Sequence, residues 1–215
     1  MKLFLTSAGL VPETKEYFLK LLNKSPKDTN ICFITTAADP SEDKWYVKKD
    51  IEILSELGFN LTEVDLKKEN EESLKKLERF DVIFVEGGNT FYLLKYVRKS
   101  GFDKVLRKIL DKGIIYFGVS AGSMIAGLNI ESAGWKHLDK NIANLKDLTA
   151  MKLVQFVISA HIDDSNIGLI RKCASKASYP VVALTDKQAI LVKNEKQRIV
   201  GTGEKYVFNM KKDML

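Results

Sequence analysis

Gly118-Val119-Ser120-Ala121-Gly122 is a G-x-S-x-G pattern, and it lies where a strand is expected to turn into a helix. Residues 113–117 (GIIYF) are apolar and rich in β-branched and aromatic side chains, as in a buried strand. Residues 123–127 (SMIAG) can begin a helix. A serine in such a turn exposes its hydroxyl, and the backbone N–H that follows it can stabilise an oxyanion. The pattern predicts a nucleophile elbow, and its alternative is a small-residue turn that packs a helix on a sheet.

Strands and helices are expected to alternate through the first two-thirds of the chain. The expected strands are 2–6, 30–36, 61–65, 81–86 and 114–117, and the expected helices are 12–22, 42–57, 71–79 and 91–112, the last broken near Gly101. This order predicts a mostly parallel sheet with helices on both faces.

The pattern changes after about residue 150. A strand at 154–159 and a helix at 166–176 precede three closely spaced strands at 181–185, 189–192 and 198–201, with 193–196 as a hairpin tip. These strands are expected to be antiparallel additions at the sheet edge. No linker or internal repeat is visible, so residues 1–215 are expected to form a single-domain α/β three-layer sandwich.

Composition excludes several classes of function. The 215 residues carry a formal net charge of +6, but the 34 Lys and Arg residues are interspersed with acidic ones, as in 67–72 (KKENEE). Because no basic stripe with aromatics is present, a nucleic-acid partner is not expected. The two cysteines, Cys32 and Cys173, are expected to be buried thiols. No signal peptide or membrane-spanning run is seen, which predicts a cytoplasmic protein with no membrane partner.

A second candidate site loop follows the strand-like run 82–85. It reads Glu86-Gly87-Gly88-Asn89-Thr90, and its two glycines allow backbone N–H groups to face a ligand. One interpretation is an oxyanion-hole or anion-binding loop. The other is a capped helix start, with Asn89 or Thr90 as N-cap. The loop lacks the Lys-Ser/Thr of a phosphate-binding P-loop.

A serine nucleophile needs a base and an acid that orients it. Of the two histidines, His161 follows a predicted strand and is expected to be the base, whereas His137 lies in a loop-like stretch and is not. Asp186 also follows a predicted strand and is the favoured acid. The alternatives are Glu131 and the pair Asp163 and Asp164, whose other possible role is to cap a helix. Two histidines far apart make a zinc site unexpected, and no metal or cofactor is predicted.

Four segments together resemble the peptidase E family of serine peptidases, which includes the cyanophycinases. They are 86–94 (EGGNTFYLL), 118–123 (GVSAGS), 160–161 (AH) and 184–186 (LTD). The resemblance implies a fold similar to class I glutamine amidotransferase domains, with a serine in place of their cysteine. It also implies Ser120 as nucleophile, His161 as base, and an oxyanion hole from the N–H groups of Gly88 and Ala121. An acidic residue, often glutamate, lies in the family where Asp186 stands here.

Peptidase E removes an N-terminal aspartate from dipeptides, which requires a cation for the substrate carboxylate. Arg171 is the candidate cation, and Asn89 and Thr90 are further candidate binding residues. The chain departs from the dipeptidases in 129–135 (NIESAGW), where Trp135 is expected in the substrate pocket or in the core, and in a shorter segment after His161. The expected function is hydrolysis of short peptides through an acyl-enzyme, with Asp-X dipeptides as one candidate class, by a monomer or homodimer.

Three alternative functions remain. An α/β-hydrolase esterase shares G-x-S-x-G, but its acid precedes its histidine in sequence, whereas Asp186 follows His161 here. A catalytically inactive, amidotransferase-like module could use the same pocket to bind a ligand. A nucleic-acid binder rests on the net charge alone and ranks last.

Overall fold

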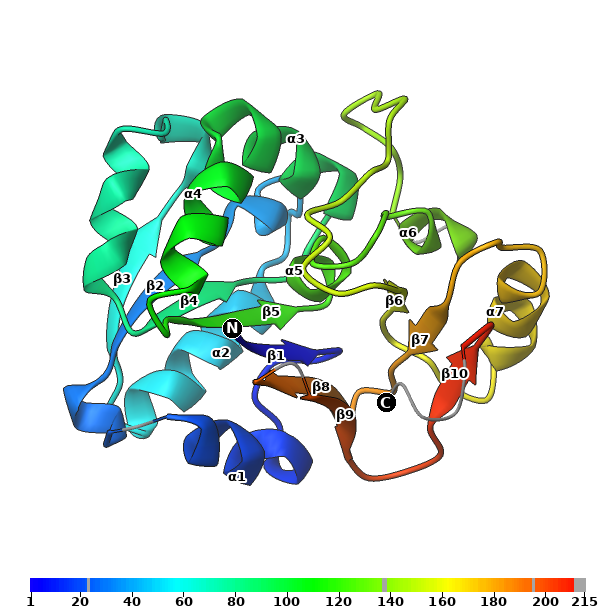
Figure 1. Ribbon diagram of the computed structural model, residues 1–215, viewed down its shortest axis with the longest axis horizontal. Helices are drawn as coiled ribbons and strands as arrows, with labels where there is room; N and C mark the ends of the chain where they lie inside the picture. The colour runs from blue at the N-terminus through cyan, green and yellow to red at the C-terminus, as the bar shows by residue number, and fades with distance from the viewer. Residues whose placement is uncertain (23, 137–138, 195, 211–215) are drawn as a thin grey trace.

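The computed structural model describes residues 1–22, 24–136, 139–194 and 196–210. Its main sheet has seven strands within these residues, in the order β3-β2-β4-β5-β1-β8-β9 (Figure 1). Five of the strands are parallel: β1 (Lys2–Thr6), β2 (Asn30–Ile34), β3 (Asn60–Val64), β4 (Val82–Val85) and β5 (Ile115–Val119). The hairpin of β8 (Gln188–Lys193) and β9 (Lys196–Gly201) adds to β1 in antiparallel fashion. The predicted α/β class, with its mostly parallel sheet and antiparallel edge, is confirmed.

Apolar cores on both faces of the sheet explain why the central strands are apolar throughout. Side chains alternate between the two faces along a strand, so that Leu3 and Leu5 of β1 belong to one core and Phe4 to the other. Helices α3 (Thr90–Ser100) and α4 (Phe102–Leu110) cover the first face, and α1 (Pro12–Leu21) and α2 (Trp45–Glu56) cover the second (Figure 1).

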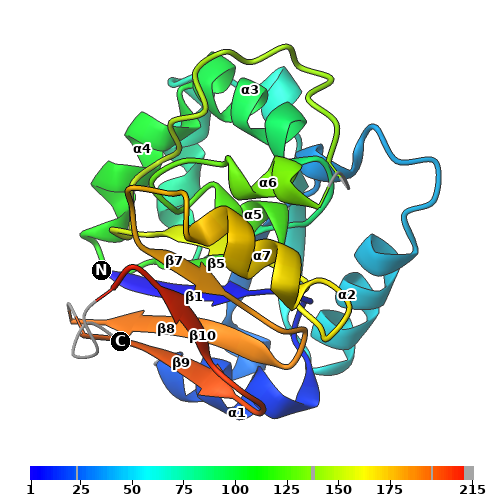
Figure 2. The same ribbon diagram turned by 90° about the vertical axis from the view of Figure 1, so that its right-hand side faces the viewer.

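A second, smaller sheet is the main departure from the expected fold. It has the order β10-β7-β6, from β6 (Val157–Ser159), β7 (Val181–Ala183) and β10 (Tyr206–Phe208). Figure 2 shows β7 beside α7 (Ile167–Ala174), and in Figure 1 the small sheet lies to the right of the main sheet. The expectation that the three late strands extend the main sheet is therefore wrong for the first of them, which is β7. The place beside β1 is taken by β8, and β7 pairs instead with β6 and β10.

Other differences are local. The helix expected at 71–79 is a 3-10 helix at Ser73–Arg79, and the stretch expected to be a loop around 131–138 contains α6 (Ser132–Trp135). The predicted break near Gly101 is confirmed, because this residue separates α3 from α4 with φ = 74°, a conformation that favours glycine. Residue 195 of the predicted hairpin tip and His137 lie outside the described residues.

The two cysteines are free thiols. Cys32 lies in the core of the sheet, where burial raises the pKa of its thiol to about 12, whereas Cys173 is only half-buried. None of the helices in the described part of the chain combines the length and hydrophobicity that a bilayer crossing needs.

Candidate active site

Ser120 occupies a strained turn between β5 and α5 (Ala121–Met124). Its backbone has φ = 45° and ψ = −105°, which is unusual for a residue with a side chain. Hydrogen bonds fix the turn on both sides, since the N–H of Ser120 donates to the carbonyl of Thr6 at 3.0 Å and its carbonyl accepts from the N–H of Met124 at 2.9 Å. The surrounding structure thus holds the serine at the end of a central strand.

The two glycines of the G-x-S-x-G pattern are required by close backbone contacts. A Cβ atom added at Gly118 would lie 2.6 Å from the carbonyl carbon of Gly122, and one added at Gly122 would lie 2.1 Å from the carbonyl oxygen of Val85. Real Cβ atoms do not approach backbone atoms so closely, so a larger residue would push α5 away from the sheet.

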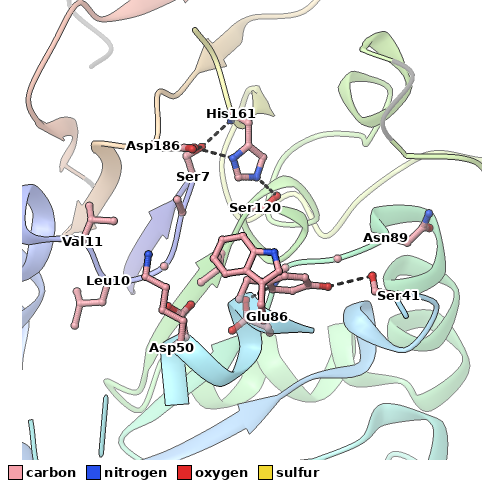
Figure 3. Close-up of a pocket in the computed structure, with 18 of the residues that line it drawn as sticks. Ser7, Leu10, Val11, Ser41, Asp50, Glu86, Asn89, Ser120, His161 and Asp186 are labelled. Carbon is pink, nitrogen blue, oxygen red and sulfur yellow. Dashed lines mark hydrogen bonds and ion pairs between the residues drawn. The ribbon is translucent and has the colours of Figure 1, made fainter. Parts of the chain in front are cut away.

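A continuous chain of hydrogen bonds joins Ser120, His161 and Asp186 (Figure 3). The distance from Ser120 Oγ to His161 Nε2 is 2.8 Å, and that from His161 Nδ1 to Asp186 Oδ1 is 2.7 Å. The hydrogen bond from His161 lowers the pKa of Asp186, which keeps this carboxyl ionised. Because an ionised carboxylate can only accept, Nδ1 carries the hydrogen and the lone pair of Nε2 faces the serine hydroxyl.

The other acids considered from the sequence lie elsewhere. Asp163 accepts hydrogen bonds from the N–H groups of Ser165 and Asn166, in the turn that precedes α7. Glu131 accepts from the hydroxyl of Tyr179. Asp186 is thus the carboxylate that the fold brings to His161.

Ser7, which sequence analysis missed, ties the site together. Its hydroxyl donates to Asp186 Oδ1 at 2.7 Å and accepts from the backbone N–H of His161, also at 2.7 Å. His161 has a left-handed backbone with φ = 57°, and Lys136 donates to its carbonyl at 3.1 Å. Its position could have indicated this role, because Ser7 directly follows β1 at the same sheet edge as the G-x-S-x-G turn.

Gly88 and Ala121, the two residues considered for an oxyanion hole, directly follow Gly87 and Ser120 in the chain. Gly88 adopts φ = 135°, and a Cβ atom there would lie 2.2 Å from the carbonyl oxygen of Ala37. The neighbouring Gly87 packs beside Ser120, since its added Cβ would be 3.3 Å from Ser120 Cβ. Among the described residues, no protein acceptor pairs with the N–H of Gly88 or of Ala121. Two unpaired donors near a serine hydroxyl can bind a negatively charged oxygen.

Asn89 and Thr90 have structural partners. Asn89 caps α3, because its Oδ1 accepts from the N–H of Tyr92 at 2.9 Å, and its amide donates to the carbonyl of Lys140. Thr90 is fully buried and donates to Asp139 at 2.5 Å. Asn89 lines the cavity beside Ser120, whereas Thr90 is not among its lining residues.

The cavity beside Ser120 has a volume of about 690 Å³ and is lined by Ser120, His161 and Asp186. Its walls include the apolar and aromatic side chains of Leu10, Val11, Trp45, Tyr46, Ile53 and Ile142.

Arg171 and Trp135 do not line this cavity. Arg171 lies on the exposed side of α7 with its guanidinium over the ring of Phe208, 5.9 Å from the centroid. Trp135 packs between α7 and the small sheet. The structure therefore brings neither residue to the site for which it was considered.

A pair of buried carboxyls, Asp50 and Glu86, also lines the cavity and was not anticipated. Their relative exposures are 6% and 1%. Burial raises the pKa of Asp50 to about 6, and burial together with the neighbouring Asp50 charge raises that of Glu86 well above its ordinary value. The signal in the sequence was an acid on the buried face of α2, between Val47 and Leu54, and another at the end of an apolar strand.

Replacing Glu86 by Gln is expected to raise the free energy of unfolding at pH 8, because the change removes a buried acid whose ionised form is disfavoured. Because both carboxyl pKa values are raised in the folded protein, the contribution of the pair to stability is complete below about pH 4. The part due to Asp50 is lost as the pH rises through about 6, its pKa in the folded protein, and the part due to Glu86 is lost as the pH rises further. Urea denaturation at pH 5 and pH 8 measures this loss, which the variant should show to a smaller extent. Glu52→Gln, at an exposed position of α2, is the control. A Glu86→Gln variant that is less stable than the wild type at pH 8 would contradict the argument.

Within the described ranges, no group of three His, Cys, Asp or Glu side chains is arranged to hold a metal ion.

Comparisons with known proteins agree on one family. A model of peptidase family S51 matches residues 3–200. An uncharacterized peptidase of Listeria monocytogenes is 31% identical, with 90% of this chain and 95% of that protein covered. Peptidase E of Shewanella amazonensis is 29% identical over 76% of this chain and 71% of its own length. Among solved structures, a candidate peptidase E protein from Listeria monocytogenes EGD-e matches with a TM-score of 0.80 at 26% identity, covering 94% of this chain and 98% of that one.

Proposed function

Because the chain belongs to peptidase family S51 and is a serine peptidase, we propose that it hydrolyses short peptides through an acyl-enzyme formed on Ser120. The observation that carries the proposal is the chain of hydrogen bonds from Ser120 through His161 to Asp186, beside a cavity of about 690 Å³. The turn between β5 and α5 serves as the nucleophile elbow that presents the serine hydroxyl to the cavity.

In the first half of the reaction, His161 Nε2 takes the proton of Ser120 as Oγ attacks the carbonyl carbon of the peptide. The negative charge that develops on the carbonyl oxygen is stabilised by the N–H groups of Gly88 and Ala121. His161 then gives its proton to the leaving nitrogen as the C–N bond breaks, which releases the amine and leaves an ester on Ser120.

In the second half, water replaces the amine. His161 takes one proton of the water as its oxygen attacks the ester carbonyl, and the same two N–H groups hold the second oxyanion. Collapse breaks the bond to Ser120 Oγ, which recovers the proton from His161. Throughout, the negative charge of Asp186 stabilises the protonated imidazole at 2.7 Å.

Ser7 acts as a positioning residue that holds Asp186 and the backbone of His161 together. Ser7→Ala is expected to lower kcat about 10-fold with little change in KM, because the imidazole loses orientation while the cavity is unchanged. Ser7→Thr keeps the hydroxyl and should recover part of kcat. Steady-state kinetics of both variants check this, and equal losses in the two would contradict a role for the hydroxyl.

Arg171, the cation expected for Asp-X specificity, lies away from the cavity. Two lysines, Lys49 and Lys140, do line the cavity and are exposed. A panel of di- and tripeptides that includes Asp-X sequences identifies the substrate class. Labelling by a fluorophosphonate, located by mass spectrometry, tests the nucleophile. The proposal expects an adduct on Ser120 that a cleaved peptide competes away, and a protein with neither adduct nor turnover would overturn it.

A further inference from the structure

The cavity contains a buried acidic pair that the hydrolytic mechanism does not use. Asp50, from α2, and Glu86, at the end of β4, come from different elements and meet on one wall of the cavity (Figure 3). The two groups are close enough that the charge of Asp50 helps to raise the pKa of the Glu86 carboxyl. Two carboxyls forced together in this way repel each other once both are ionised.

Neither acid has a cation of its own among the residues that the structure describes. No ion pair involves Asp50 or Glu86, although the surface carries many others. Glu86 Oε1 accepts from the N–H of Gly87, but Oε2 is fully buried and receives no hydrogen bond from a protein donor in the described part of the chain. Buried carboxylates are normally paired, so an unpaired one at a substrate cavity indicates a partner that arrives with the ligand.

The cation next to Asp50 in sequence forms no ion pair with it, although its charge lowers the pKa of the Asp50 carboxyl. Lys49 precedes Asp50, but it is exposed and its ammonium lies over the ring of Trp45, 5.8 Å from the centroid. The face of the Trp45 ring is therefore in contact with a positive charge in this structure. Trp45 is 60% exposed and packs edge-on against Tyr46, with ring centroids 6.0 Å apart. Aromatic faces beside carboxylates are a favourable environment for an organic cation.

The pair is also close to the reacting serine. Glu86 directly precedes Gly87, whose backbone packs against Ser120. Asp50 packs against the loop after β1, since a Cβ atom at Gly9 would lie 2.3 Å from Asp50 Oδ1. A peptide bound at Ser120 therefore extends along a wall that carries both acids.

We propose that Asp50 and Glu86, with the rings of Trp45 and Tyr46, form a subsite for an ammonium group of the peptide substrate. The subsite rests on the proposed function, because it occupies the same cavity as Ser120. The ammonium has two possible sources in a peptide, the free N-terminus and the side chain of a lysine.

Matched peptides separate these sources. Norleucyl-alanine carries a free N-terminal ammonium, N-acetyl-norleucyl-alanine carries none, and N-acetyl-lysyl-alanine carries one on the side chain alone. The wild type should prefer at least one of the two cationic peptides over the neutral one, by roughly 10- to 100-fold in kcat/KM. A preference for norleucyl-alanine identifies the N-terminus as the source of the ammonium group. A preference for N-acetyl-lysyl-alanine identifies the lysine side chain. Equal kcat/KM values for all three peptides would overturn the subsite.

Two variants locate the preference. The double variant Asp50→Asn, Glu86→Gln should lose the preference through a lower kcat/KM for the cationic peptide, with less than about a threefold change for the neutral one. The changes keep side-chain size and remove repulsion, so folding is expected to persist. Trp45→Ala, at an exposed position, should weaken the same preference, whereas Glu52→Gln should leave it intact. A preference that survives in the double variant would contradict the assignment.

Binding measurements keep the subsite testable if no peptide is cleaved. Calorimetry with Ser120→Ala and the three peptides reports affinity without turnover. Tighter binding of a cationic peptide that disappears when Asp50→Asn and Glu86→Gln are added would support the subsite even if the proposed hydrolysis failed. Equal affinity for all three peptides would overturn it, whether or not the wild type is a peptidase of these substrates.

Discussion

Replacing Ser120 by Ala is expected to lower kcat for peptide hydrolysis by at least about 10⁴-fold. The variant removes the only hydroxyl in hydrogen-bond contact with His161 Nε2 among the described residues, so the acyl-enzyme cannot form. The oxyanion donors and the cavity remain, and peptides should still bind with a KM or Kd close to that of the wild type. Kinetics on the best peptide of the panel, with calorimetry for binding, measure both quantities.

The matched control is Ser175→Ala, which removes an exposed hydroxyl that donates to the carbonyl of Lys172 at the end of α7. It should retain wild-type kcat within twofold. Peptide hydrolysis that persists at the wild-type rate in Ser120→Ala would sink the proposed mechanism, and it would direct attention to another nucleophile.

Asp186→Ala is expected to lower kcat by roughly 10³- to 10⁴-fold, because His161 loses both its orientation and the negative charge that stabilises its protonated form. Asp186→Asn should be milder, at about 10²-fold. A single oxygen, Oδ1, accepts from both His161 and Ser7, and the amide oxygen of asparagine can accept the same two hydrogen bonds. The tautomer of the imidazole is then preserved, and the charge alone is lost.

The graded result distinguishes this geometry from one in which both carboxylate oxygens are engaged. Asp163→Ala and Asp164→Ala, which change the two acids that follow His161 in sequence, are the controls and should stay within about threefold of the wild type. Equal losses for Asp186→Ala and Asp186→Asn would contradict the shared-oxygen arrangement.

Most of the fold could be predicted because each central strand is visible as a short apolar run in the sequence. Apolar runs of strand length alternate with amphipathic helices, and a right-handed crossover rule fixes their layering. The small sheet could not be predicted in this way. Strand character at 157–159 and 181–183 is visible in the sequence. Which strands these segments pair with depends on a distant segment, because β8 takes the position beside β1 and β7 pairs with β6 instead.

The site shows the same division. Ser120, His161 and Asp186 each come shortly after a strand, and this position predicted that their side chains would lie close together. The strands before His161 and Asp186, β6 and β7, belong to the second sheet rather than to the main one. Asp50 was hidden, because an acid within an amphipathic helix is normally solvated, and only packing against Gly9 shows that it faces inward. The prediction that Arg171 binds the substrate was wrong because packing sets the orientation of α7. Ile170 and Ala174 form the buried face of this helix, and Arg171 lies over the ring of Phe208.

The bridge from Ser7 to Asp186 spans 179 positions of the sequence, and the one from Ser7 to His161 spans 154. As the chain leaves the ribosome, strands β1 to β5 and the strained serine turn emerge long before Asp186 and its neighbour β8, which completes the pairing of β1. A nascent chain that has folded its central strands therefore carries the serine without its acid. On the proposed mechanism, hydrolysis is therefore expected only after Asp186 has been synthesised and β8 has paired with β1.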